Sequence, residues 1–249
     1  MLTRRIGSAF SVGLLLSATL TGALAAGGTA AGADPRPPGK EPVAVGYGGA
    51  VVSDTVESTE AGLEILRQGG TATDAAVAVA ATLGVTDPYV AGLGGGGYFV
   101  HYDARTRQVS TIDGRETTPS AGSSTMFVDP ATGQPYPFPV AVTSGLGVGV
   151  PGMLATWERA LDRWGRFDLD DTLKPAIRVA DRGFTVDAMF REQTRQNAGR
   201  FAQFSSTAEL FLPGGELPEV GSRLRNPDLA DTYREIARHG TGAFYGGSI

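Results

Sequence analysis

An arginine beyond a predicted hairpin is the residue of this chain whose type best suits the binding of a ligand. Arg115 lies in residues 113–117, Asp-Gly-Arg-Glu-Thr. A guanidinium presents a planar fork of N–H donors to a carboxylate, and lysine cannot copy that geometry. The same run also fits a charged turn in which Arg115 is merely solvated. Because most surface charges are solvated, the residues alone favour this second interpretation.

A glycine run at residues 92–97 satisfies the pattern G-x-G-x-x-G of dinucleotide-binding proteins. That pattern works between a strand and a helix, because the helix N-terminus faces the pyrophosphate. Here Thr-Asp-Pro at 86–88 precedes the run and the strand-like residues 98–100 follow it, so we expect no nucleotide site. Two interpretations remain: a turn packed too closely for a Cβ, which is the default, and a loop whose N–H groups line a substrate cleft.

Other familiar kinds of catalytic and metal site find little support. The sequence contains neither G-x-S-x-G nor S-x-x-K, so the usual serine-nucleophile motifs are missing. It has no cysteine, which excludes disulfides, thiol nucleophiles and Cys-ligated metals. We expect His101 to be an ordinary strand residue and His239 to lie at a helix C-terminus, where a cation suits the dipole. The sequence therefore predicts no metal and no cofactor.

Composition limits the partners. Of 249 residues, 21 are Lys or Arg and 26 are Asp or Glu, which gives a net charge of −5. Neither a nucleic acid nor an anionic membrane surface is an expected partner of such a chain. The 36 glycines are roughly twice the usual share. With 41% hydrophobic residues, this composition indicates a folded protein with many tight backbone positions.

The first residues have the pattern of an export signal. Arg4 and Arg5 precede a charge-free, partly apolar stretch that ends in Ala-x-Ala patterns. We expect residues 1–33 to be a secretory signal peptide, with an uncleaved anchor as the alternative; the arginine pair leaves Sec and twin-arginine export both open. Residues 34–42 are expected to be a linker, and residues 43–249 one folded region of a secreted or extracytoplasmic protein.

Strands are expected early in this region and helices mostly late. We predict a buried strand at 43–52, paired strands at 97–103 and 107–113, and five helices. The first predicted helix runs from Asp54 to Gln68, and the second, over 75–83, is capped by Thr73 or Asp74 and is apolar on every side. The third, over 153–164, has Trp157 and Trp164 on its core face. The fourth carries Leu173, Ile177 and Ala180, and the fifth runs from Asn226 to Gly240. Without βαβ alternation, the fold class is α+β.

Five motifs, taken in order, resemble the N-terminal half of the γ-glutamyltransferases, or glutathione hydrolases. They are G-G-T-A-T-D-A-A-V-A at 69–78, the glycine run at 92–97, D-G-R-E-T at 113–117, G-V-P-G at 149–152 and G-A-F-Y-G-G at 242–247. The resemblance covers about residues 43–249. It implies the N-terminal nucleophile hydrolase fold, an αββα sandwich of which this chain would supply an incomplete, large-subunit part.

The family also implies a chemistry. Its members are secreted or surface-bound precursors that cleave themselves into two subunits. The new N-terminal threonine of the small subunit attacks a γ-glutamyl amide, and water or an amino acid resolves the acyl-enzyme. The implied partners are γ-glutamyl small molecules such as glutathione and the small subunit of the same precursor, with no cofactor.

The resemblance assigns one binding residue. The family's D-G-R-E-T arginine holds the glutamyl α-carboxylate, so this role passes to Arg115 and replaces the solvated interpretation. Asp113 and Glu116 receive only orienting roles. No catalytic residue is carried over, because the family's nucleophile lies in a T-T-H-x-S-type motif and the Thr-Thr pair at 117–118 is followed by Pro119. The chain alone is therefore expected to be inactive.

Two departures from the family pattern leave alternatives open. Thr71 stands where asparagine is more usual, and Tyr-Val-Ala at 89–91 replaces polar residues before the glycine run. The second departure leaves the leaving-group and acceptor preference undecided. The alternative functions are a related acylase of the cephalosporin or polyglutamate type, and a non-catalytic exported remnant that binds glutamyl compounds. Arg115 favours a glutamyl donor.

Overall fold

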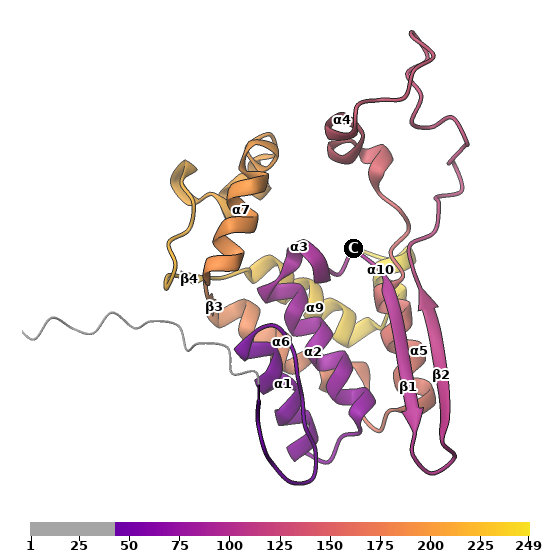
Figure 1. Ribbon diagram of the computed structural model, residues 1–249, viewed down its shortest axis with the longest axis vertical. Coiled ribbons are helices and arrows are strands. Elements are labelled where there is room, and N and C mark those ends of the chain that lie inside the picture. Colours follow the sequence, from indigo (N-terminus) through magenta and orange to yellow (C-terminus); the bar gives the residue numbers. More distant parts are fainter. Residues whose placement is uncertain (1–42) are drawn as a thin grey trace, which may run out of the picture. The chain divides into compact units, whose positions relative to one another are not determined.

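The computed structural model describes residues 43–249 (Figure 1). The expected signal peptide at 1–33 and the expected linker at 34–42 lie outside the described residues. Within 43–249, no helix has the length and apolarity needed to cross a membrane.

A stack of four helices forms the centre of the fold: α1 (Val56–Arg67), α2 (Ala72–Thr86), α6 (Leu169–Arg182) and α9 (Pro227–His239). Helix α2 packs on α1 and on α6, and α6 packs on α9 (Figure 1). Since neighbours cover α2 on more than one side, its apolar composition all round is explained. Val77, Ala78 and Ala81 of this helix are completely buried.

The starts of the first two helices differ from the prediction. Helix α1 is capped by Thr55, whose hydroxyl accepts from the N–H of Ser58, and not by Asp54. Helix α2 begins three residues earlier than predicted, because Thr71 is its N-cap. The Thr71 hydroxyl accepts from the N–H of Asp74, and the Asp74 carboxylate accepts from the N–H of Thr71. Neither Thr73 nor Asp74 is the cap; Asp74 is the reciprocal partner of a capping box.

The predicted hairpin is confirmed. Strands β1 (Gly97–Asp103) and β2 (Gln108–Gly114) pair antiparallel, with Gly97 opposite Gly114. Helix α5 (Met153–Trp164) packs on both strands, and its Trp157 is buried in the core. Trp164 is only half-buried and stacks on the ring of His101, with ring centroids 4.4 Å apart. His101 is therefore a strand residue, as predicted.

The predicted strand at 43–52 is wrong. These residues form no strand, and Val45 and Val52 are each 94% exposed. A strand needs a neighbour for its backbone N–H and C=O groups, and no strand of the described part of the chain pairs with this segment. Apolar composition alone therefore did not make a strand here.

The remaining elements are short, apart from α7. β3 and β4 form a second antiparallel pair of two residues each. The elements are α3 (Pro88–Ala91), α4 (Phe138–Thr143), η1 (Gly145–Gly147), β3 (Phe184–Thr185), α7 (Ala188–Phe201), α8 (Ser205–Phe211), η2 (Pro213–Gly215), β4 (Arg223–Leu224) and α10 (Gly242–Gly246). The predicted helices ending at Gly165, Gly183 and Gly240 are confirmed, each glycine being the C-cap.

Candidate functional site

The glycine run is fastened to the start of α5. The carbonyl oxygen of Gly95 accepts hydrogen bonds from the N–H groups of Gly152 and Met153, both at 3.1 Å. Next to this junction, Thr117 and Val150 exchange two backbone hydrogen bonds of 3.2 and 2.8 Å. Three of the sequence motifs, at 92–97, 113–117 and 149–152, therefore meet at one place.

Two glycines at this junction leave no room for a side chain. A Cβ on Gly96 would lie 2.4 Å from the carbonyl oxygen of Gly114, and a Cβ on Gly152 would lie 2.1 Å from the same atom. The default interpretation of the glycine run, a closely packed turn, is thus confirmed at Gly96. Gly94 differs, since nothing lies within 4 Å of the position of its Cβ. Because a strand follows the run, its context is not that of a dinucleotide site.

Gly94 opens onto a cavity of about 540 Å³. Its lining comes from the glycine run, from the residues after β2 and from the segment that ends at α5. The lining residues are Gly94, Arg115, Glu116, Thr117, Thr118, Pro119, Met126, Phe127, Leu146, Gly147, Val148 and Gly149. The volume lies within the usual range for small-molecule sites.

Arg115 contacts both acidic residues of its motif. Its Nε lies 3.3 Å from Oε2 of Glu116, and its backbone N–H donates to Oδ1 of Asp113 at 3.1 Å. The Arg115 side chain remains 61% exposed. Among residues 43–249, its guanidinium makes no other hydrogen bond or ion pair, so its Nη donors are available to a carboxylate in the cavity.

Neither histidine considered in the sequence lines this cavity. His239 ends α9, with Nε2 3.7 Å from Oε1 of Glu235. His101 is stacked on Trp164. The threonine pair, Thr117 and Thr118, does line the cavity. The described residues contain no cluster of three His, Asp or Glu side chains able to hold a metal ion.

Sequence reasoning missed the role of Tyr89, which lies just before the glycine run. Its hydroxyl shares a hydrogen bond with the hydroxyl of Thr194, and its ring contacts Phe190 edge-on at a centroid distance of 5.3 Å. Burial raises the pKa of Tyr89 to about 12. The departure of Tyr-Val-Ala at 89–91 from the family pattern draws attention to this position. Its partner Thr194 lies more than a hundred residues away, so no local sequence pattern indicates the contact. Tyr89 anchors α3 to α7.

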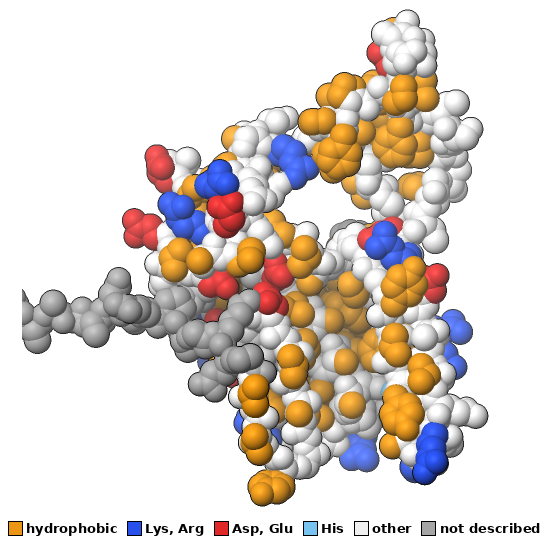
Figure 2. All heavy atoms as spheres, viewed as in Figure 1, with side chains coloured by type: hydrophobic (Ala, Val, Ile, Leu, Met, Phe, Trp, Pro, Cys, Tyr) orange, Lys and Arg blue, Asp and Glu red, His pale blue; other side chains and the backbone are white. Residues whose placement is uncertain are grey.

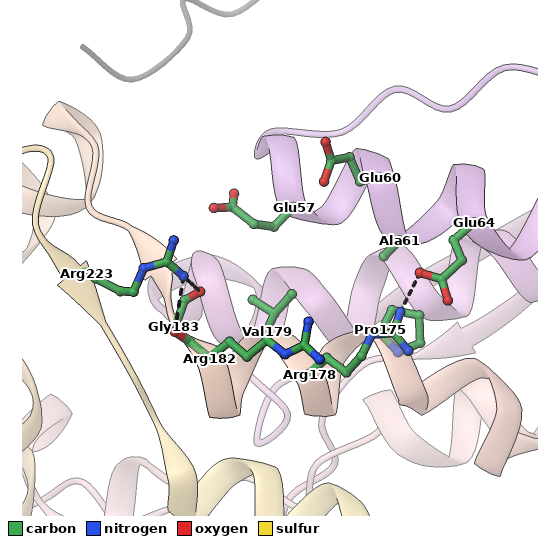
Figure 3. Close-up of a pocket in the computed structure, with 10 residues that line it drawn as sticks. All are labelled: Glu57, Glu60, Ala61, Glu64, Pro175, Arg178, Val179, Arg182, Gly183 and Arg223. Atoms are coloured by element: carbon green, nitrogen blue, oxygen red, sulfur yellow. Dashed lines mark hydrogen bonds and ion pairs between the residues drawn. The ribbon is translucent and has the colours of Figure 1, made fainter. Parts of the chain in front are cut away.

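A second concave region, of about 270 Å³, lies between α1 and α6 (Figure 3). Glu64 forms an ion pair with Arg178, and Glu57 accepts from the N–H of Thr185 at 3.3 Å. Arg223 donates to the carbonyl oxygens of residues 182 and 183 at 3.1 and 2.9 Å (Figure 3). These charges mainly join α1, α6 and β4, and none of the predicted site residues lies there.

Comparison with known proteins agrees with this picture. The family model described as gamma-glutamyltranspeptidase matches residues 58–249. The glutathione hydrolase proenzyme of Bacillus subtilis (strain 168) is 37% identical over 239 residues, covering 94% of this chain and 40% of that protein. The corresponding proenzyme of Escherichia coli (strain K12) is 33% identical over 235 residues, covering 89% of this chain and 39% of that protein.

Solved structures give the same result. The gamma-glutamyltranspeptidase of Helicobacter pylori superposes with a TM-score of 0.78 at 31% identity, covering 83% of this chain and 58% of that one. A cephalosporin acylase from Bacillus halodurans superposes with a TM-score of 0.65 at 27% identity, covering 77% of this chain and 36% of that one. The chain thus spans about 40% of the length of the curated relatives above. The predicted α+β, N-terminal nucleophile hydrolase fold class is confirmed, and the chain belongs to the gamma-glutamyltranspeptidase family.

Proposed function

We propose that this chain is the large-subunit part of a secreted γ-glutamyltransferase, which cleaves γ-glutamyl amides such as glutathione and passes the glutamyl group to water or an amino acid. One observation carries the proposal: Arg115 lines a cavity of about 540 Å³, and its Nη donors are unused by the described residues. A substrate carboxylate is the group that such a fork binds best.

In this proposal, Arg115 binds the α-carboxylate of the donor and Glu116 keeps the guanidinium turned toward the cavity through its contact with Nε. The reaction itself needs a threonine of the small subunit. Its hydroxyl oxygen would bond to the γ-carbonyl carbon, and the C–N bond would break as the amine leaves with a proton. Water or an amino acid would then cleave the resulting ester and regenerate the threonine.

Residues 1–249 alone are proposed to be inactive. The only Thr-Thr pair is at 117–118, and Pro119 follows it where the family's nucleophile motif has histidine. Thr117 also follows Glu116 within the chain and so has no free amino group, and its backbone pairs with that of Val150. Catalysis therefore requires the small subunit of the same precursor.

The complete precursor, carrying both subunits, provides the test. Three p-nitroanilides should be compared: γ-glutamyl; 4-aminobutyryl, which lacks the α-carboxylate; and glutaryl, which lacks the α-ammonium group. Turnover of the γ-glutamyl compound at least tenfold faster than the 4-aminobutyryl compound is expected, because a charge-assisted hydrogen bond contributes about 1.5–3 kcal/mol. Equal turnover of these two would contradict the proposal.

The glutaryl compound tests the acylase alternative. It keeps the carboxylate that Arg115 would bind, so Arg115 by itself does not reject it. Faster turnover of glutaryl than of γ-glutamyl donors would replace the proposed function by an acylase of the cephalosporin type. Residues 1–249 expressed alone serve as the inactive control; activity there would refute the need for a second subunit.

The proposal of secretion has its own test. Residues 1–33 carry the basic start, apolar middle and Ala-x-Ala end of an export signal. Mass spectrometry of the protein from the medium or the cell envelope should find an N-terminus between residues 26 and 34. Full-length protein confined to the cytosol would contradict export.

A further inference from the structure

One part of the Arg115 cavity is apolar. This part is lined by Met126, Phe127, Leu146 and Val148. The exposed fraction is 41% for Phe127, 42% for Leu146 and 62% for Val148. We call these four residues the apolar wall. Side chains of this kind gather over the segment around α4 on the face shown in Figure 2. Grouped exposed apolar side chains usually mark a binding surface.

Backbone hydrogen bonds hold two members of the apolar wall in closed turns. The carbonyl oxygen of Phe127 accepts from the N–H of Tyr136 at 2.8 Å. Leu146 lies in the short helix η1, where the N–H of Gly147 donates to the carbonyl oxygen of Ser144 at 3.1 Å. The apolar wall is thus supported by the fold of its own segment.

The charges of the cavity restrict its occupant. Among residues 43–249, Arg115 and Glu116 are the only charged residues that line it. If Arg115 binds the α-carboxylate, no second cation of this lining is left for another carboxylate, and Glu116 would repel one. A glutamyl group alone fills only part of about 540 Å³. The remaining space, beside the apolar wall, suits an uncharged apolar group.

We propose that the apolar wall binds the amine part of the donor, so that γ-glutamyl amides of aromatic or branched aliphatic amines are preferred over those of glycine or glutamate. This inference rests on the proposed function. Phe127 and Leu146 are specificity-determining residues in it. The rival occupant of the apolar wall is the remainder of the precursor.

The experiment compares donors on the complete, processed precursor. For γ-glutamyl-benzylamide, γ-glutamyl-methylamide and γ-glutamyl-glycine, kcat/KM should rank in that order, with the benzylamide favoured over the methylamide by roughly tenfold, as expected when an aromatic ring loses about half of its contact with water. All three donors share the glutamyl group, so differences arise at the amine part.

Phe127→Ala and Leu146→Ala should each reduce the benzylamide-to-methylamide ratio of kcat/KM by about threefold or more, chiefly through KM. Phe138→Ala is the matched control, because Phe138 lies in the same segment, is 77% exposed and does not line the cavity. An unchanged ratio in both variants would overturn the inference.

A fall of kcat/KM for all donors together, with loss of association between the subunits, would also overturn the inference. The apolar wall would then be assigned to contact with the remainder of the precursor. Failure of the proposed function looks different, since then the wild-type precursor turns over none of the γ-glutamyl donors.

Discussion

The carbonyl oxygen of Gly95 accepts a hydrogen bond of 3.1 Å from the N–H of Met153, the first residue of α5. This bond attaches the glycine run to the helix that covers the hairpin. Because Gly114 at the end of the hairpin packs against Gly96 and Gly152, the backbone that carries Arg115 is fixed by the same junction.

Gly152→Ala should destabilise the protein. Its new Cβ would lie 2.1 Å from the carbonyl oxygen of Gly114, a backbone atom that cannot rotate away. We expect the free energy of unfolding to fall by about 1–3 kcal/mol or more, the range for overpacking. Urea unfolding measures this. Gly94→Ala is the matched control, because nothing lies within 4 Å of its Cβ position; an equal loss in both variants would refute the packing argument.

Asp74→Ala should weaken the attachment of α2 to the loop between α5 and α6. The buried Asp74 carboxylate accepts from the N–H groups of Arg166 at 3.0 Å and Phe167 at 3.1 Å, and from that of Thr71. Unsatisfied buried amides cost about 1–3 kcal/mol each, so a total loss of at least about 2 kcal/mol is expected in thermal or urea unfolding.

Asp168→Ala serves as the control for that variant. Asp168 is the exposed N-cap of α6 and its side chain makes no capping hydrogen bond. Its removal should cost only a few tenths of a kcal/mol, from the helix dipole. Similar losses in the two variants would show that Asp74 does not have the stabilising role described.

Alkaline pH should destabilise the fold through Tyr89. Burial raises the pKa of this phenol from 10.0 to about 12, so its protonated form is favoured in the folded state. The associated stability is complete below pH 10 and is lost as the pH rises from 10 through 12. Tyr89→Phe should show a shallower loss over this range. The loss should not vanish, because burial also raises the pKa of Tyr233. Identical pH profiles for the two proteins would contradict the assignment.

The helices and the hairpin could be predicted because their signals are local. Trp157 and the apolar residues spaced with it define the core face of α5, and a glycine ends the helix. The segment 43–52 could not be predicted, since an apolar run becomes a strand only beside a partner. The choice of Thr55 over Asp54 as the cap depends on backbone geometry that neighbouring residues in sequence do not specify.

The site could be predicted only in part. The D-G-R-E-T motif points to Arg115, which lines the same cavity as Gly94. No sequence pattern indicates the apolar wall, because Phe127 and Leu146 lie in turns without periodicity. The contact of Tyr89 with Thr194 joins residues far apart in the sequence, which local patterns cannot reveal.

Arg115→Lys in the complete precursor is the most direct test of the central claim, the binding of the donor carboxylate by the Arg115 guanidinium. Lysine keeps the charge but loses the planar fork, so kcat/KM for γ-glutamyl-p-nitroanilide should fall about tenfold or more, while that for the 4-aminobutyryl compound, which has no carboxylate, should stay the same. Arg105→Lys, at a side chain 90% exposed in the hairpin turn, should change neither value. Unchanged kcat/KM for the γ-glutamyl donor in Arg115→Lys would contradict the account.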